Sequence, residues 1–146
     1  MGNRAVITTR ENWKNNGVGV YLHWNGGRDS VEGFLAYCKL KEYREPEYDN
    51  YGWARLCQVI GNFFGGDTDV AIDTLNNLDT DNGDNGVYII EDWEIVDRVN
   101  FYGEEQHNYG LMDVLREINR RQPVREQIRE DFLEPNLVLN KLGRKA

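Results

Sequence analysis

The sequence predicts a single α+β domain, residues 1–146, in which three or four helices pack on an antiparallel sheet of about five strands. Three observations support this fold class. Segments with alternating apolar residues, typical of half-buried strands, are interspersed with segments of helical apolar spacing. The chain of 146 residues is 40% apolar and 12% aromatic, which suffices for a buried core. Clusters of glycine, asparagine and aspartate separate the segments, as turns require.

Residues 4–9 and 17–24 are predicted to form the first two strands, joined as a hairpin through a short polar connection. In the second strand Val18, Val20 and Leu22 occupy alternate positions, so that one face is apolar. This alternation is typical of a strand with one buried face.

A helix is predicted to begin near Ser30, after a glycine-rich turn. Asp29 stands three residues before Glu32, which is the spacing of a capping box. The helix has an apolar face made of Val31, Phe34, Leu35 and Cys38.

A second helix is predicted from residue 50, capped by Asn50 and stopped by Gly65 and Gly66. Its apolar stripe consists of Trp53, Leu56, Cys57, Ile60, Phe63 and Phe64, and is the most hydrophobic face in the chain. Residues 42–50, which precede it, form an acidic loop that contains two tyrosines and Pro46.

The next strands are predicted at residues 69–75 and 86–102, connected as a hairpin through a run of turn-forming residues. The alternation within residues 86–102 changes phase, so we expect a bulge or turn near Glu91 and Asp92.

Asn108 is predicted to cap a third helix that extends to about Gln122 and ends at Pro123. Residues 123–146 are predicted to be a peripheral part of the domain. They comprise a short fourth helix at 124–134 and a frayed, basic tail.

The net charge of −8 is concentrated in the middle of the chain. Residues 66–105 hold twelve acidic side chains and one basic one, Arg98. This distribution disfavours direct binding of DNA and favours either a basic protein partner or plain solubility. The sequence contains no membrane-spanning run and no signal-peptide core, so we expect a cytoplasmic protein, without a membrane partner. The two cysteines, Cys38 and Cys57, are expected to be buried thiols in a reducing compartment.

A ligand site is one interpretation of the turn between the second strand and the first helix. Its backbone amides and Arg28 suit an anionic or nucleotide-like ligand, and Trp24 offers a ring for stacking. The candidate ligand-binding residues are Trp24, Asn25, Gly26, Gly27, Arg28 and, if two helix starts converge, Arg55. The alternative is a plain strand-to-helix connection, and Asp29 supports it by placing a negative charge where the anion would bind.

Two groups of carboxylates are further candidates. Asp79, Asp81 and Asp84 resemble calcium ligands, but the EF-hand pattern fails, because placing Gly86 sixth puts Gly83 third. We therefore predict a hairpin connection, and neither a metal nor another cofactor. The second group, Glu91, Asp92 and Glu94 beside Trp93, is either an acidic site or a solvated strand edge.

The sequence gives little support for catalysis. The two histidines, His23 and His107, stand in no metal-binding or catalytic spacing, and neither cysteine is in an electropositive context. We therefore predict that the protein is not an enzyme. A small hydrolase with paired carboxylates stays open as an alternative, although nothing singles out a pair.

Three segments carry a resemblance: GVYLHWNGGRDSVEGFLAYCK, YGWARLCQVIGNFFGG and DTDNGDNGVYIIEDWEIV. Together they resemble a group of small acidic proteins from phages and integrative elements of Gram-positive bacteria, mostly of unassigned function. The resemblance covers residues 4–122 and brings no catalytic motif. It implies a setting in the host bacterial cytosol, where such accessory proteins often act as anti-CRISPR proteins or as sponges for nucleotide signals.

Two binding hypotheses follow. In the first, the protein inhibits a basic host defence protein, such as a CRISPR nuclease, through an acidic surface that mimics nucleic acid. The residues expected to bind that partner are Asp79, Asp81, Asp84, Glu91, Asp92 and Glu94. In the second, the turn around Arg28 sequesters a nucleotide immune signal, in a pocket closed by neighbouring chains of a homo-oligomer.

Overall fold

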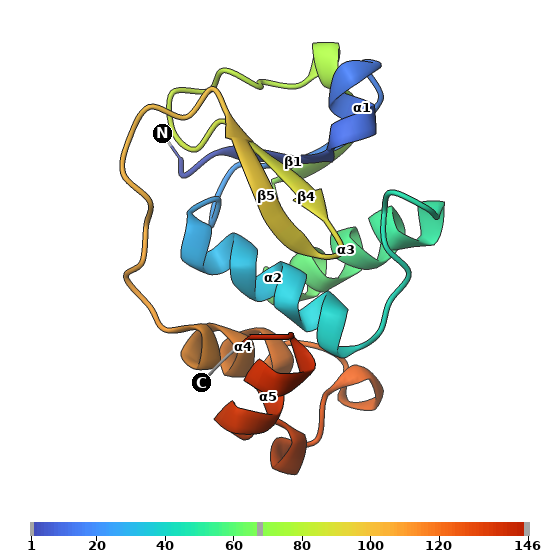
Figure 1. Ribbon diagram of the computed structural model, residues 1–146, viewed down its shortest axis with the longest axis vertical. Helices are drawn as coiled ribbons and strands as arrows, with labels where there is room; N and C mark the ends of the chain where they lie inside the picture. The colour runs from blue at the N-terminus through green and yellow to red at the C-terminus, as the bar shows by residue number, and fades with distance from the viewer. Residues whose placement is uncertain (1, 67–68, 145–146) are drawn as a thin grey trace.

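The computed structural model of the chain describes residues 2–66 and 69–144. Within these residues a five-stranded sheet is packed against helices, which confirms the α+β class (Figure 1). The strands are β1 (Ala5–Thr9), β2 (Val18–Leu22), β3 (Val70–Thr74), β4 (Val87–Glu91) and β5 (Glu94–Val99). The α-helices are α1 (Arg10–Lys14), α2 (Arg28–Leu40), α3 (Asn50–Phe63), α4 (Leu111–Arg120) and α5 (Pro135–Lys141). Three short 3-10 helices are η1 (Leu75–Asn77), η2 (Val124–Glu126) and η3 (Glu130–Phe132).

The strand order is β3-β2-β1-β4-β5, which places the N-terminal strand β1 at the centre of the sheet. The pairs β1–β2, β2–β3 and β4–β5 are antiparallel, whereas β1 and β4 are parallel. The predicted antiparallel pairing is therefore confirmed for these three pairs, and the central pair β1–β4 departs from it. One edge of β1 pairs with β2, its neighbour in sequence. The other edge pairs with β4, which lies far along the chain.

The predicted hairpin between β3 and β4 is also wrong, because β2 and β1 lie between them in the sheet. The connecting segment instead crosses one face of the sheet. Leu75 and Leu78 from this segment pack against Val6, Val87 and neighbouring residues in a small apolar cluster. Burial of these leucines holds the segment against the sheet, whereas a tight turn would leave them exposed.

The main core lies between the other face of the sheet and the helices α2, α3, α4 and α5. As predicted, Val20 and Leu22 of β2 point into this core, and Val18 packs against it. Helix α2 lies next to the sheet, and α4 and α5 lie beyond α2 (Figure 1). The predicted phase change in the fourth strand is confirmed as the turn between β4 and β5, with an irregularity at Ile89 and Ile90.

The helix starts differ from the predicted ones. Helix α2 begins at Arg28, and Asp29 does not cap it. The Asp29 side chain instead accepts hydrogen bonds from the backbone N–H of Ser30, at 2.8 Å, and of Asn108, at 3.1 Å, tying α2 to a distant segment. Helix α3 is capped by Asp49 and not by Asn50. Helix α4 begins at Leu111, so Asn108 does not cap it.

The C-terminal prediction needs a larger correction. Residues 124–134 contain the 3-10 helices η2 and η3 and no α-helix. Helix α5 forms instead at Pro135–Lys141, and it includes the first two residues of the tail 140–146 that we expect from the sequence to fray. Val138 and Leu142 are buried in the main core, and Arg144 pairs with Glu94 at 2.7 Å. Pro135 at the start of α5 and the Glu134 carboxylate, which accepts two backbone hydrogen bonds, explain why a helix forms there.

Candidate functional site

The glycine turn before α2 is shaped by close packing within the chain. A Cβ atom at Gly26 would lie 2.4 Å from the carbonyl oxygen of Asn3, and one at Gly27 would lie 2.3 Å from the side chain of Gln106. The backbone N–H of Gly26 already donates to Asn3, at 2.8 Å, and that of Asp29 to Gln106, at 3.0 Å. These glycines and amides therefore serve the fold, and Asn25 adopts a positive φ of 57° within the same turn.

Arg28, the main candidate for binding an anion, is held by two carboxylates. It donates to Glu32 at 2.7 Å and to Glu105 at 2.5 Å. Burial alone would lower the pKa of Arg28, but the hydrogen bonds to these carboxylates outweigh it and raise the pKa. Trp24 is half-exposed and donates from Nε1 to Asp69 at 3.1 Å. The guanidinium of Arg28 and the indole N–H of Trp24 therefore already have anionic partners within the chain.

Arg55 does not converge with Arg28. Its guanidinium lies over the ring of Tyr43, 4.9 Å from the ring centroid, and Tyr43 follows the C-terminal end of α2. Arg28 begins α2, a helix of 13 residues, so the two arginines lie near opposite ends of an element about 20 Å long. The predicted pocket that would join Trp24, Arg28 and Arg55 is therefore not assembled within this chain.

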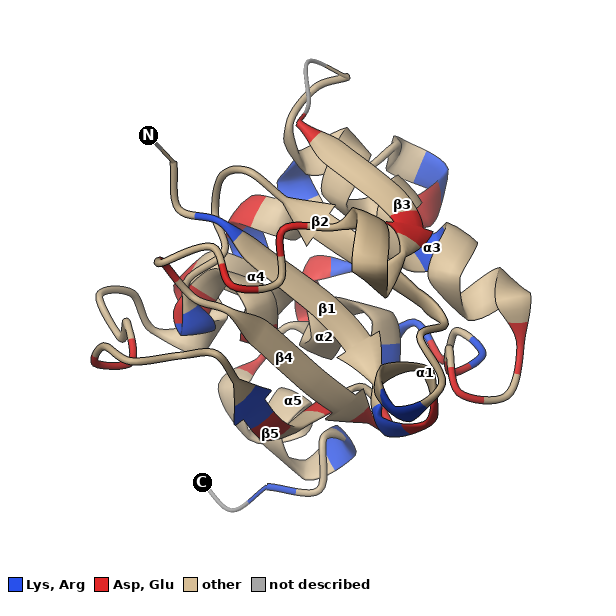
Figure 2. Cartoon of the chain, turned by 90° about the horizontal axis from the view of Figure 1, so that it is seen from above, with Lys and Arg blue, Asp and Glu red and all other residues tan. Residues whose placement is uncertain are grey.

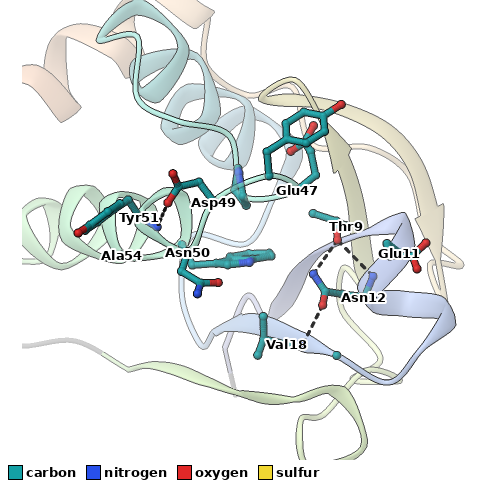
Figure 3. A pocket seen from close by; sticks show the side chains of 13 residues that line it. Thr9, Glu11, Asn12, Val18, Glu47, Asp49, Asn50, Tyr51 and Ala54 are labelled. Atoms are coloured by element: carbon teal, nitrogen blue, oxygen red, sulfur yellow. Dashed lines mark hydrogen bonds between the residues drawn. The ribbon is translucent and has the colours of Figure 1, made fainter.

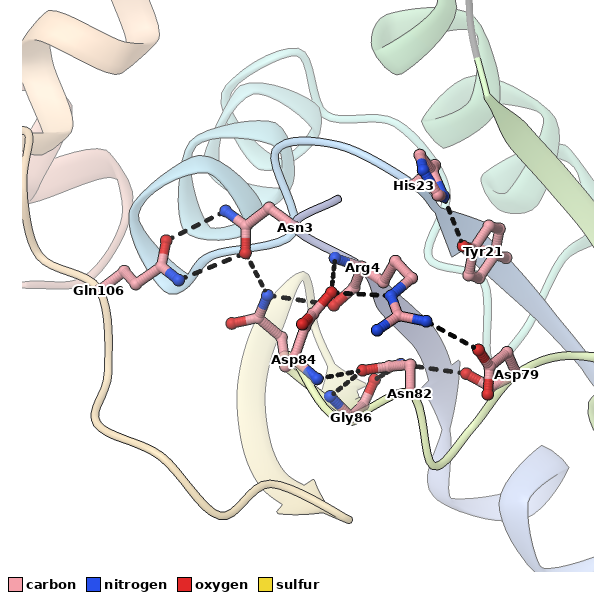
Figure 4. A network of polar contacts seen from close by, with 10 residues as sticks. Asn3, Arg4, Tyr21, His23, Asp79, Asn82, Asp84, Gly86 and Gln106 are labelled. Carbon is pink, nitrogen blue, oxygen red and sulfur yellow. Dashed lines mark hydrogen bonds and ion pairs between the residues drawn. The ribbon is translucent and has the colours of Figure 1, made fainter. Parts of the chain in front are cut away.

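The first group of candidate carboxylates belongs to the loop of residues 79–86, here named the paired loop. Asp84 accepts from the backbone N–H of Arg4 at 3.0 Å and from its Nε at 2.8 Å, and Asp79 lies 3.4 Å from the same guanidinium (Figure 4). Hydrogen bonding from Arg4 outweighs the effect of burial and lowers the pKa of Asp84. Asp81 is exposed and forms no ion pair with any described residue.

A buried amide fixes the shape of the paired loop. Asn82 donates to the carbonyl groups of Asp79 and Gly86 and accepts from the N–H groups of Asp84 and Gly86, all at 3.0–3.2 Å (Figure 4). The loop thus resembles a calcium site only in sequence, since Arg4 provides the positive charge. Two of its three candidate partner-binding carboxylates, those of Asp79 and Asp84, already have a cationic partner.

The second group of carboxylates lies in the β4–β5 turn, at the opposite end of the sheet. Asp92 and Glu94 lie 3.4 and 3.3 Å from the ammonium of Lys39, and Glu94 also pairs with Arg144. Glu91 is exposed and forms no ion pair with a described residue. Strands of five residues separate this turn from the paired loop by about 16 Å. The acidic residues of this region thus lie on separate loops and also on strands of the sheet (Figure 2), and Asp67 lies outside the described residues.

A cleft of about 1000 Å³ opens beside the β4–β5 turn, where the parallel strands β1 and β4 end. One wall is formed by Thr9, Asn12 and Val18 from β1, α1 and β2 (Figure 3). The opposite wall comes from the acidic tyrosine-bearing loop and the first turn of α3, which contribute Glu47, Tyr48, Asp49, Tyr51 and Trp53. Ligands of open sheets commonly bind at the carboxyl ends of parallel strands, and this cleft has that position.

The cleft is acidic and aromatic. Its described lining includes the carboxylates of Glu11, Glu47 and Asp49 and no lysine, arginine or histidine. Tyr48 and Tyr51 are 80% and 65% exposed, and one face of the Tyr51 ring is already covered by the guanidinium of Arg44. These features suit a positively charged group, which would interact with both the carboxylates and the faces of the rings.

Glu47 and Glu45 lie close to Asp92 of the β4–β5 turn, so that three carboxylates are near one another. Oε2 of Glu47 accepts from the backbone N–H of Asp92 at 2.7 Å, whereas Oε1 is buried and has no hydrogen-bond partner among the described residues. The pKa of Glu45 is raised, first by its side-chain hydrogen bond with Asp92, then by burial, and also by the charge of Glu47. The cleft side of the sheet therefore carries negative charge that the chain itself does not neutralise.

The sequence predicts the acidic tyrosine-bearing loop but no function for it. The only local indication of a binding site there is its composition, EYREPEYDN, which combines carboxylates with tyrosines. The remaining walls come from residues 9–18 and from the start of α3, which no local pattern connects with that loop.

Residue types that often carry catalysis have ordinary structural roles in the described part of the chain. The His23 ring bonds through Nδ1 to the Tyr21 hydroxyl at 2.8 Å. Burial raises the pKa of the thiols of Cys38 and Cys57, which keeps both as poor nucleophiles. No group of three or more histidine, cysteine or acidic side chains that could hold a metal ion occurs within residues 2–66 and 69–144.

None of the helices in these residues has the length and apolar composition needed to span a bilayer. Comparison of the chain with models of known protein families, with curated proteins and with solved structures gives no match.

Proposed function

We propose that this protein binds a basic protein partner through the acidic end of its sheet, and that it acts in the host bacterial cytosol as a counter-defence inhibitor of an effector such as a CRISPR nuclease. The acidic end is defined here as the cleft, the acidic tyrosine-bearing loop and the β4–β5 turn. The counter-defence setting derives from the resemblance to phage and mobile-element proteins, and the structural support is the charge at this end.

The observation that carries the proposal is a set of carboxylates without cationic partners. Glu11, Glu45, Glu47 and Glu91 form no ion pair with any described residue, although all belong to the acidic end. Like charges held together raise the free energy of the unbound protein, and a basic partner would relieve that repulsion on binding. Such a field would also accelerate association, and salt would weaken it.

The set of residues that we propose to bind the partner is smaller than the set of six predicted from the sequence. Within the predicted set, Asp92 contacts the cleft residue Glu47 through its backbone N–H, and Glu91 beside it forms no ion pair with a described residue. Asp79 and Asp84 are instead engaged by Arg4, and Glu94 is engaged by Lys39 and Arg144. The nucleotide-sponge alternative finds no support in Arg28, whose guanidinium is held by Glu32 and Glu105.

The test is a plasmid-interference assay in bacteria that carry an active CRISPR nuclease, with this protein expressed in trans. We expect the wild-type chain to restore plasmid uptake, and the double variant Glu47→Gln with Glu91→Gln to lose most of that effect. Asp79→Asn with Asp81→Asn removes the same charge from the paired loop and should keep it. Inhibition by neither wild type nor variant, across nucleases of several types, would refute the counter-defence proposal.

The purified protein provides the second arm. Its inhibition of the same nuclease in vitro should fall steeply as salt rises from about 50 to about 300 mM, because the attraction between exposed charges is screened over that range. Release of a bound nucleotide on heating, detected by mass spectrometry, would instead support the sponge alternative.

A further inference from the structure

We propose that the cleft is a receptor for a guanidinium group, so that one arginine side chain of the basic partner inserts between the acidic tyrosine-bearing loop and α1. This inference rests on the proposed function, because it identifies the part of the partner that the acidic end recognises. The ligand is defined by its chemistry: a planar, permanently charged group on an extended side chain.

The shape and lining of the cleft suit this group. The volume of about 1000 Å³ accommodates a side chain together with part of the segment that carries it. Tyr48 and Tyr51 line the cleft and have exposed rings. Glu47 and Asp49 belong to the wall opposite α1, and the Tyr51 side chain extends along the rim away from α1 (Figure 3). A guanidinium stacks on an aromatic ring while its edge donates to a carboxylate, which an ammonium cannot do with the same planar geometry.

Glu47 is the proposed anchor. Its Oε2 is fixed by the backbone N–H of Asp92, which orients the carboxylate, while the buried Oε1 has no described donor. A buried carboxylate oxygen without a partner is costly. Rotation of the Glu47 side chain toward the cleft on binding would let an N–H donor of the incoming group satisfy this oxygen. The same contact would place positive charge among Glu45, Glu47 and Asp92. The pKa of Glu45 is raised first by its side-chain hydrogen bond with Asp92, then by burial, and after that by the charges of Asp92 and Glu47.

The chain itself contains an example of the proposed contact at the rim of the cleft. Arg44 donates to Asp49 at 2.9 Å, and its guanidinium lies 5.2 Å from the centroid of the Tyr51 ring. This arginine uses one carboxylate and one ring that also line the cleft. We infer that Arg44 competes with the partner for these groups, and that its removal exposes them.

The experiment is a titration of the full-length protein with a labelled peptide of alternating arginine and glycine, followed by fluorescence anisotropy. Matched peptides carry lysine or citrulline in place of arginine. We expect the arginine peptide to bind several times more tightly than the lysine peptide, and the citrulline peptide not to bind. Equal binding of the arginine and lysine peptides would overturn the inference, because it would indicate general charge attraction.

Two substitutions locate the site. Glu47→Gln keeps an oxygen that can accept from Asp92 but removes the charge, and should weaken arginine-peptide binding about tenfold. Asp81→Asn, the matched control, removes one exposed charge from the paired loop and should change binding by less than about twofold. Equal effects of the two substitutions would place the peptide elsewhere.

Arg44→Gln gives a test with the opposite sign. It makes the protein more acidic and frees Asp49 and Tyr51, so peptide affinity should rise about threefold. Weaker binding would show that Arg44 supports the site and would overturn its role as a competitor.

In the indole region of an NMR spectrum, the Trp53 signal, assigned with Trp53→Phe, should shift on addition of peptide, since Trp53 lines the cleft.

The two proposals fail differently. Peptide binding that depends on Glu47, together with unchanged plasmid interference, would refute the counter-defence function and leave the guanidinium site intact. Rescue of plasmid uptake that survives Glu47→Gln, with no arginine preference in the peptide assay, would refute the guanidinium site.

Discussion

The paired loop and the acidic end lie at opposite ends of the same strands and use similar residues in contrasting ways. In the paired loop one arginine, Arg4, binds Asp79 and Asp84, and a buried amide holds the backbone. At the acidic end, Lys39, Arg44 and Arg144 engage some carboxylates, but four others have no cationic partner. Asp79 and Asp84 thus stabilise one end, whereas the other end, where we propose that a basic partner binds, keeps carboxylates without a cationic partner among the described residues.

The largest expected effect follows from Asn82→Ala in the paired loop. The substitution leaves four backbone groups without their side-chain partner, and should lower the free energy of unfolding by about 3 kcal/mol. Urea unfolding followed by circular dichroism measures it. Asn108→Ala changes an exposed amide and should have little effect, and equal losses for the two variants would contradict the structural role of the paired loop.

A smaller, pH-dependent effect is expected for Asp84→Asn. Because Arg4 lowers the pKa of Asp84 in the folded protein, the pair stabilises the fold fully above the unfolded pKa of about 3.9. That contribution disappears as the pH falls through the lower, folded pKa. The variant should therefore be less stable than wild type at pH 6, and the two should converge in strong acid. Thermal unfolding across this range tests it, with Asp81→Asn as a control that shows no such convergence.

The smallest effect, of opposite sign, is expected for Glu45→Gln at the acidic end. The raised pKa of Glu45 means that its ionised form is disfavoured in the folded protein at neutral pH, and this cost vanishes below the unfolded pKa of about 4.3. The variant should be slightly more stable than wild type at pH 7, within about 0.5 kcal/mol, and should lose that advantage in acid. Destabilisation at pH 7 would mean that the acidic end is held together by contacts and is not strained by charge.

The parts of the fold that the sequence predicted are those encoded within one segment. The alternation of β2 and the apolar stripe of α3 each depend on spacing along a few turns or residues, and both are confirmed. The pairing of β1 with β4 and the path of Leu75 over the sheet depend on contacts between distant segments, which periodicity does not record. Helix α5 is not among the predicted elements, although Glu134 as its N-cap and Pro135 as its first residue are a recognisable sequence pattern for a helix start.

The candidate site likewise shows that a local sequence pattern does not record contacts between distant segments. Arg28 and the glycines before it form a local pattern typical of anion binding, but Glu105 and Gln106, far along the chain, occupy the positions that a ligand would need. The cleft has no local pattern, because its walls come from residues 9–18 and 46–54. The sequence shows an excess of acidic residues in the middle of the chain. Which of these carboxylates have a cationic partner depends on contacts between distant segments, and only the folded structure reveals them.

The central position of β1 determines the order in which the sheet can be completed during synthesis. This strand leaves the ribosome first and can pair with β2 at once, yet its other edge must wait for β4. At a synthesis rate of about 5–20 residues per second that interval is on the order of several seconds. During it one edge of Ala5–Thr9 presents unpaired backbone N–H and C=O groups, beside apolar side chains, which offers a site for chaperones and a route to aggregation.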